Sequence, residues 1–308
     1  MKSLLAAIPL LLSTGVLSAQ LSSSTRPHLP GGLDPLVPGH VLVSGFDSDT
    51  LHRYRARDGA ARGSTAVAGP QSIVLGADNR LYVCAEKADR VVRQDPVTLQ
   101  RIDIFVQDDP ATPEDENGPL DGPTAATFGP DGALYVASFD NDQILRFDGQ
   151  TGAYLGVFVA QGLGNLNGPD AGTKWGADGL LYVPSFWNDR VLRYDATGAF
   201  AGEFVSFREG GLRQPRDLVQ HNGDWYVASS LSNRILRYDS LGNFVGVFAI
   251  SPQPYGLAFN PHDDNLYVVS PLTNNVRVFH GETGGFLRIL VPAGAGGIDG
   301  AVYLFFLE

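Results

Sequence analysis

The sequence predicts an all-β fold, namely a six-bladed β-propeller whose blades are four-stranded antiparallel sheets. The first observation behind this prediction is an internal repeat: residues 121–159 and 167–205 have nearly the same sequence, and looser copies occupy 69–106, 213–249 and 253–291. The second is that short apolar runs alternate with Gly, Asp and Asn turns, with no segment showing the period of an amphipathic helix. Fixed-period repeats of four short strands are typical of propellers.

The repeat at 167–205 shows how each strand of a blade is predicted. A turn signal, Asn167-Gly168-Pro169, precedes the first strand. Three further turns, rich in Gly, Asp and Asn, follow at 176–179, 186–189 and 195–198. The strands before, between and after these turns are therefore expected at 170–175, 180–185, 191–194 and 200–205.

A tyrosine in the second strand marks the spacing of the repeats. It recurs as Tyr82, Tyr135, Tyr182, Tyr226 and Tyr267. The intervals are 53, 47, 44 and 41 residues, and they approach the length of about 40 residues common in propeller repeats. The excess in the first interval is an acidic stretch at 107–120, which is expected to be an insertion between two blades.

The two ends of the repeat region together predict the sixth blade. Residues 40–67 resemble strands two to four of a blade that lacks its first strand, and 297–306 align with 119–128, the start of a first strand. The C-terminal strand is therefore expected to join the N-terminal blade and close the ring. Closure removes the free sheet edges that an open array would expose.

The first 39 residues precede the predicted propeller domain at 40–308. Residues 1–19 read as a signal peptide, with Lys2 before an apolar run and Leu17-Ser18-Ala19 as a cleavage site. An uncleaved anchor is the alternative. Residues 20–39 are rich in Ser, Pro and Gly and are expected to form a leader. We therefore expect a secreted or periplasmic protein with no membrane span after cleavage.

Charge and cysteine content restrict the partners. The net charge of −11 at pH 7 disfavours nucleic acid, whose phosphates would repel such a chain. Cys84 is the only cysteine, so no disulfide is expected. We also expect a monomer, whose partner is a protein, a peptide or a glycan.

The repeat resembles the NHL repeat. The resemblance rests on Gly-Pro, Asp-Gly-x-Leu-Tyr-Val, Asn-x-Arg and Leu-Arg-Tyr-Asp, is clearest at 167–195 and 213–239, and extends over essentially all of 40–308. It implies a six-bladed propeller. NHL-type propellers include protein-binding platforms, RNA-binding domains and lyases. They are distantly similar to gluconolactonase-like hydrolases and to streptogramin-lyase-like propellers. The resemblance therefore does not select one function.

The candidate site lies at one mouth of the central channel. The residue after each Gly-Pro is expected at this mouth, since the first strand of every blade lines the channel. Around the ring this position is occupied by Gln71, Thr124, Asp170, Arg216, Tyr255 and Ala301. Such chemical variety within a regular repeat suggests residues recruited for a ligand. The alternative is that these side chains are simply solvated.

The loops between second and third strands open on the same face. Phe139 and Trp187 stand out there, because such loops are normally polar. Aromatic rings on a concave rim suit sugars or apolar peptide side chains, although packing on a neighbouring blade is the alternative. The motif Asn188-Asp189-Arg190 in the same loop is expected to be structural, with its arginine pairing with a neighbouring blade.

A metal-dependent hydrolase or lyase at the same mouth is the alternative function. Only Asp170 and Asp217 could contribute carboxylates near a cation, with Gln71 or Thr124 as weak extra ligands. The glutamate that gluconolactonase-like enzymes would place there is absent from the ring positions. The six histidines show no close metal-ligand spacing. Calcium could instead bind the acidic insertion, at Asp108-Asp109 and Glu114-Asp115-Glu116. No cofactor is expected otherwise.

The sequence therefore favours an exported binding module over an enzyme, without deciding between them. Asp170, Arg216 and Tyr255 are expected to provide polar specificity, and Phe139 with Trp187 apolar contact. Replacing Arg216 and Trp187 together by alanine is expected to abolish ligand binding and to lower the thermal stability only slightly.

Overall fold

The computed structural model describes residues 39–107 and 120–307. The chain divides into two compact units, Met1–Gly32 and Leu33–Glu308, and the description concerns the second. The predicted signal peptide, the leader except for residue 39, and the calcium candidates of the acidic insertion lie outside the described residues. Within the described ranges, no helix has the length and apolarity needed to cross a membrane.

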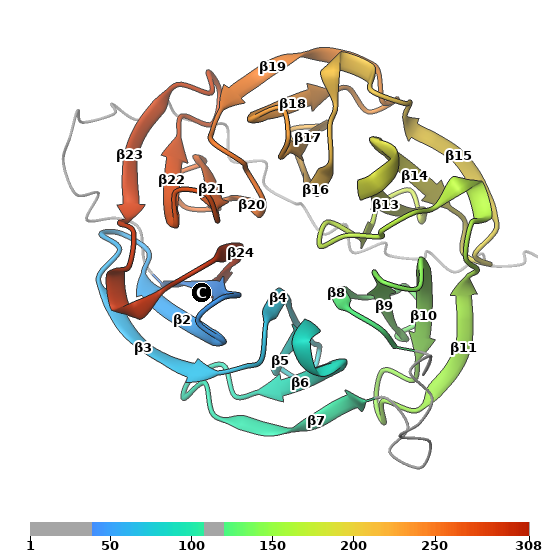
Figure 1. Ribbon diagram of the computed structural model, residues 1–308, viewed down its shortest axis with the longest axis horizontal. Helices are drawn as coiled ribbons and strands as arrows, with labels where there is room; N and C mark the ends of the chain where they lie inside the picture. The colour runs from blue at the N-terminus through green and yellow to red at the C-terminus, as the bar shows by residue number, and fades with distance from the viewer. Residues whose placement is uncertain (1–38, 108–119, 308) are drawn as a thin grey trace, which may run out of the picture. The chain divides into compact units, whose positions relative to one another are not determined.

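Six four-stranded antiparallel sheets follow one another around a centre, which confirms the predicted six-bladed propeller (Figure 1). Blade 1 contains β24 (Ala301–Leu307), β1 (His40–Gly45), β2 (Thr50–Arg55) and β3 (Ala61–Ala66). Blade 2 contains β4 (Pro70–Leu75), β5 (Leu81–Ala85), β6 (Arg90–Gln94) and β7 (Arg101–Gln107). Blade 3 contains β8 (Pro123–Phe128), β9 (Leu134–Ser138), β10 (Gln143–Phe147) and β11 (Tyr154–Val159).

The other three blades follow the same order, with the first strand innermost and the fourth outermost (Figure 1). Blade 4 contains β12 (Lys174–Trp175), β13 (Leu181–Ser185), β14 (Arg190–Tyr194) and β15 (Phe200–Val205). Blade 5 contains β16 (Pro215–His221), β17 (Asp224–Ser229), β18 (Arg234–Tyr238) and β19 (Phe244–Ile250). Blade 6 contains β20 (Leu257–Phe259), β21 (Leu266–Ser270), β22 (Asn275–Phe279) and β23 (Phe286–Val291).

The first strand of blade 4 is shorter than predicted. We expected a strand over 170–175, but β12 has only two residues. The segment before it turns instead, because the Thr173 N–H donates to the Asp170 carbonyl and the Gly172 N–H donates to the Arg216 carbonyl of blade 5. A Cβ at Gly172 would lie 2.7 Å from the Asp217 backbone, so only glycine permits this approach. Contact with the neighbouring blade thus overrides the strand pattern.

The ring closes as predicted through β24, which pairs with β1 antiparallel from His40 opposite Leu307 to Gly45 opposite Ala301. Ala301 therefore takes the place that Pro123 takes opposite Ser138 in blade 3. The residue that follows such a proline is the one expected at the mouth, so Val302, and not Ala301, occupies the sixth ring position.

The core lies between successive blades and is organised by the repeated tyrosine. Tyr82 packs edge-on against Phe105 of its own blade, with ring centroids 4.9 Å apart, and against Phe128 of blade 3, at 5.0 Å. Tyr135, Tyr182, Tyr226 and Tyr267 are equally buried and meet aromatic rings of the next blade. Such aromatic pairs add to the apolar area that these rings bury, so one repeated residue joins each of blades 2 to 6 to the next blade.

The Asn-Asp-Arg motif also joins blades, but through its aspartate. Asp189 adopts a left-handed backbone conformation with φ of 52°, and its carboxylate accepts the Gln214 N–H of blade 5 at 2.8 Å. The equivalent contacts are Asp49 with Gly69, Asp89 with Gly122, Asp142 with Gly168 and Asn233 with Gln253. The expectation that the arginine would pair with a neighbouring blade is wrong, because Arg190 pairs with Glu203 of its own blade.

Candidate functional site

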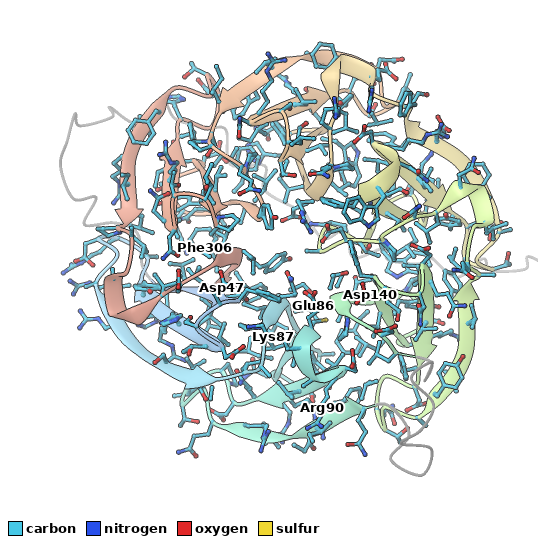
Figure 2. All side chains as sticks on the ribbon, viewed as in Figure 1. Asp47, Glu86, Lys87, Arg90, Asp140 and Phe306 are labelled. Atoms are coloured by element: carbon cyan, nitrogen blue, oxygen red, sulfur yellow. The ribbon has the colours of Figure 1, made fainter. Side chains whose placement is uncertain are left out.

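A cavity of about 330 Å³ opens at the mouth where the first strands begin. It is lined by residues from all six blades. Six of the seven predicted site residues contribute to this lining: Gln71, Thr124, Phe139, Trp187, Arg216 and Tyr255. The seventh, Asp170, lies buried beneath Arg216. The lining residues that the site prediction omitted include Phe46, Asp47, Glu86, Phe186 and Val302. Figure 2 shows Asp47, Glu86 and Asp140 close to the centre of the ring.

Arg216 is held between two aromatic rings. Its guanidinium carbon lies 3.9 Å from the centroid of the Phe186 ring and 4.2 Å from that of Tyr255. Nη1 donates to Asp170 Oδ2 at 2.7 Å, and Nη2 donates to the Tyr255 hydroxyl at 2.9 Å. The guanidinium is therefore fixed by stacking and by charge-assisted hydrogen bonds. Since it balances a buried carboxylate, the expectation that replacing Arg216 would barely affect stability needs correction.

The two carboxylates considered for a cation are engaged in other contacts. Asp170 accepts the N–H of the following residue and the Arg216 guanidinium. Burial raises the pKa of Asp170, and the positive charge of Arg216 opposes that shift. Asp217 accepts the next backbone N–H, Lys174 Nζ at 3.2 Å and the Leu257 N–H at 2.9 Å. These oxygens do not form the set of free ligands that a hard cation needs.

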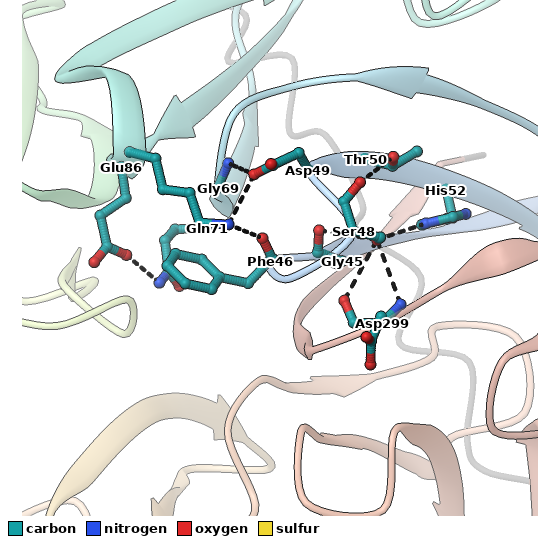
Figure 3. A network of polar contacts seen from close by, with 11 residues as sticks. Gly45, Phe46, Ser48, Asp49, Thr50, His52, Gly69, Gln71, Glu86 and Asp299 are labelled. Carbon is teal, nitrogen blue, oxygen red and sulfur yellow. Dashed lines mark hydrogen bonds and ion pairs between the residues drawn. The ribbon is translucent and has the colours of Figure 1, made fainter.

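No group of three or more His, Cys, Asp or Glu side chains in 39–107 and 120–307 is arranged to hold a metal ion. A serine–histidine pair does occur at the blade 1 end of the mouth, where Ser48 Oγ lies 3.3 Å from His52 Nε2 (Figure 3). Its hydroxyl also contacts the Gly45 and Asp299 carbonyls, and it accepts the Asp299 N–H. These contacts tie the β1–β2 loop to the segment before β24, so the pair serves ring closure.

Glu86 is the partly buried carboxyl group of the cavity lining, and the site prediction did not include it. It begins η1 (Glu86–Ala88), and its carboxylate accepts a hydrogen bond from the Gln71 amide (Figure 3). The pKa of Glu86 is raised to about 7, chiefly by burial. The Gln71 hydrogen bond and the charge of Arg216 oppose this rise, whereas the charges of Asp170 and Asp140 contribute to it. A carboxyl group with such a pKa can exchange a proton near neutral pH.

The repeat itself contained the signal for Glu86. Glu86 and Lys87 occupy the loop between the second and third strands of blade 2. Counted from the end of the second strand, Glu86 corresponds to Phe139 of blade 3, and Lys87 corresponds to Trp187 of blade 4. Aligning that loop in all six blades would have placed Glu86 on the mouth face. Lys87 is engaged elsewhere, since Nζ donates to the Phe46 carbonyl at 2.8 Å and to Asp49 at 2.9 Å.

Three aromatic rings form one wall of the mouth. Phe186 and Trp187 meet edge-on at 4.5 Å between centroids, and Phe139 lies 5.8 Å from Phe186 and 6.3 Å from Trp187. The rings of Phe139 and Trp187 both lie next to Gly168 of blade 4. Phe139 belongs to blade 3, so it packs on a neighbouring blade, which was the alternative to a role in ligand binding. Trp187 differs, because 57% of its surface stays exposed.

Comparisons with known proteins agree on the fold. No protein-family model matches the chain, and no curated protein does either, so the NHL resemblance stays a prediction. A chain from the crystal structure of a nidogen/laminin complex superposes with a TM-score of 0.68 at 13% identity, covering 87% of this chain and 98% of that one.

Two lyase structures are also similar. A streptogramin B lyase superposes with a TM-score of 0.58 at 13% identity, over 82% of this chain and 79% of that one. A catalytically inactive virginiamycin B lyase from Staphylococcus aureus, solved with quinupristin, gives 0.54 at 17% identity, over 77% and 75%. At these identities the likeness establishes the propeller fold, which binding proteins and enzymes share.

Proposed function

We propose that this chain is an exported binding module that holds a segment of a protein or peptide, or a glycan, in the mouth cavity. The observation that carries the proposal is the exposed Trp187 beside a fixed Arg216, in a cavity to which every blade contributes a chemically different side chain. Aromatic and arginine side chains in a concave site are typical of binding hot spots. The likeness to a chain of a nidogen/laminin complex supports a protein partner.

The test uses peptide and glycan arrays probed with residues 20–308 and with the Trp187→Ala variant. Because Trp187 is largely exposed, its replacement should leave the fold intact and abolish binding. Leu241→Ala is the matched control, since Leu241 is 75% exposed in a turn between third and fourth strands, at the opposite end of the blade. Ligands that bind wild type and Trp187→Ala equally would contradict a site at this mouth.

Glu86 supports a second candidate function, a hydrolase or lyase in which its carboxyl group acts as general acid or base. A pKa of about 7 in a site lined by aromatic rings suits that role. The test measures the disappearance of lactones and of quinupristin, the compound bound in one of the similar structures. Turnover that Glu86→Gln abolishes would favour this function, whereas no turnover by the wild type would reject it for these substrates.

A further inference from the structure

The charges at the mouth are not balanced. Arg216 is paired with Asp170, and Lys87 with Asp49. In the described part of the chain, no ion pair involves Asp47, Glu86 or Asp140, and all three lie near the centre of the ring (Figure 2). The cavity therefore retains negative charge when Glu86 is ionised.

The aromatic wall stands beside this negative charge. Phe186 provides an example within the same wall. The Arg216 guanidinium stacks on its ring and also donates a hydrogen bond to the Asp170 carboxylate. Trp187 has a free surface of the same kind, and Phe139 lies next to it. Aromatic faces and carboxylates together favour a cation with an apolar stem.

From these contacts we infer that the mouth cavity receives a positively charged side chain, lysine or arginine, presented by a partner polypeptide. Its aliphatic stem lies along Phe139 and Trp187, and its charged head is directed at Glu86 and Asp47. The inference rests on the proposed function and selects a basic peptide over a glycan.

Size and protonation agree with this occupant. A cavity of about 330 Å³ is at the small end for ligand sites, which suits one or two side chains. The groups that act on the Glu86 charge are Gln71, Asp140, Asp170 and Arg216, and none of them is a free cation. A bound ammonium or guanidinium group would supply the missing counter-charge and lower the pKa of Glu86.

The test is a selection from a random peptide display library against the full chain at pH 8 and low salt. Selected peptides are resynthesised with each lysine replaced by norleucine and each arginine by citrulline, which removes the charge and keeps most of the shape. We expect these replacements to weaken binding by about tenfold or more. Glu86→Gln with Asp47→Asn should have a similar effect, whereas Glu282→Gln, an exposed charge in a turn between third and fourth strands, should have none.

The outcomes separate this inference from the proposed function. Peptides that lose binding with Trp187→Ala and also with the neutral replacements support both. Peptides that depend on Trp187 but keep their affinity after neutral replacement overturn the basic side chain and leave a mouth-binding module. A selection in which no peptide depends on Trp187 overturns both for polypeptide ligands.

Discussion

Replacing Arg216 by alanine tests whether the arginine is part of the fold as well as of the cavity. The Asp170 side chain is only 1% exposed, and without Arg216 its carboxylate keeps one backbone hydrogen bond. Removing one member of a buried ion pair costs about 3–5 kcal/mol, and the lost stacking on Phe186 and Tyr255 adds to this. We expect the melting temperature to fall by roughly 10 °C or more.

The pH dependence of this loss identifies its cause. Burial already raises the pKa of Asp170, and removing the guanidinium raises it further. A group whose pKa is higher in the folded state stabilises the fold when protonated, and that contribution is lost as the pH rises. The deficit of Arg216→Ala should therefore be largest near pH 8 and shrink towards pH 5, measured by urea unfolding.

Arg216→Ala combined with Asp170→Asn is the control, because it removes both charges of the pair, and its deficit should not grow towards pH 8. The reasoning would be refuted by an Arg216→Ala variant that unfolds within about 1 kcal/mol of wild type at pH 8, since surface substitutions alone cost no more than this. The same result would restore the sequence-based expectation that Arg216 is dispensable for stability.

Three further predictions address single residues. Because the pKa of Glu86 is raised from 4.5 to about 7, the wild type should lose stability between about pH 5 and pH 8, by at most about 3 kcal/mol. Glu86→Gln should abolish this loss, as measured by urea unfolding at both pH values. Gly198→Ala should melt well below wild type, because its Cβ would lie 2.1 Å from the Phe158 carbonyl oxygen at φ of +84°; Gly179→Ala, with positive φ and no near atom, should cost less. Asp189→Ala should cost about 1–3 kcal/mol in urea unfolding and speed amide exchange of Gln214, while unchanged exchange would argue against this blade contact.

The fold could be predicted because the repeated tyrosine acts the same way in blades 2 to 6. Tyr82 and its equivalents mark the second strand and also form the contact to the next blade, so their spacing reports the architecture directly. Ring closure was predictable for the same reason, since β24 supplies the strand that blade 1 lacks. The length of β12 was not predictable, because the bend before it depends on Gly172 meeting the backbone of blade 5.

The site was predictable in position but not in its internal contacts. Four of the six predicted ring positions, Gln71, Thr124, Arg216 and Tyr255, line the mouth cavity, whereas Asp170 is buried and Val302 takes the place predicted for Ala301. The sequence also presented Asp170, Arg216 and Tyr255 as three separate groups facing a ligand. They sit on blades 4, 5 and 6 and bind one another. A repeat shows which residues one blade contains. Contacts between unlike residues of adjacent blades depend instead on how the blades are arranged around the ring. The raised pKa of Glu86 likewise depends on its burial in the folded ring.

The pairing of β24 with β1 also sets the order in which this chain can fold. Residues 40–45 leave the ribosome first among the described strands, and their partner, 301–307, leaves last. Blades 2 to 6 can each form from contiguous sequence during synthesis, but blade 1 waits with an unpaired inner edge until the final strand arrives. Such a long-range pairing is slow to form and exposes an edge meanwhile. The closing strand therefore converts a row of five finished blades into one cooperative ring.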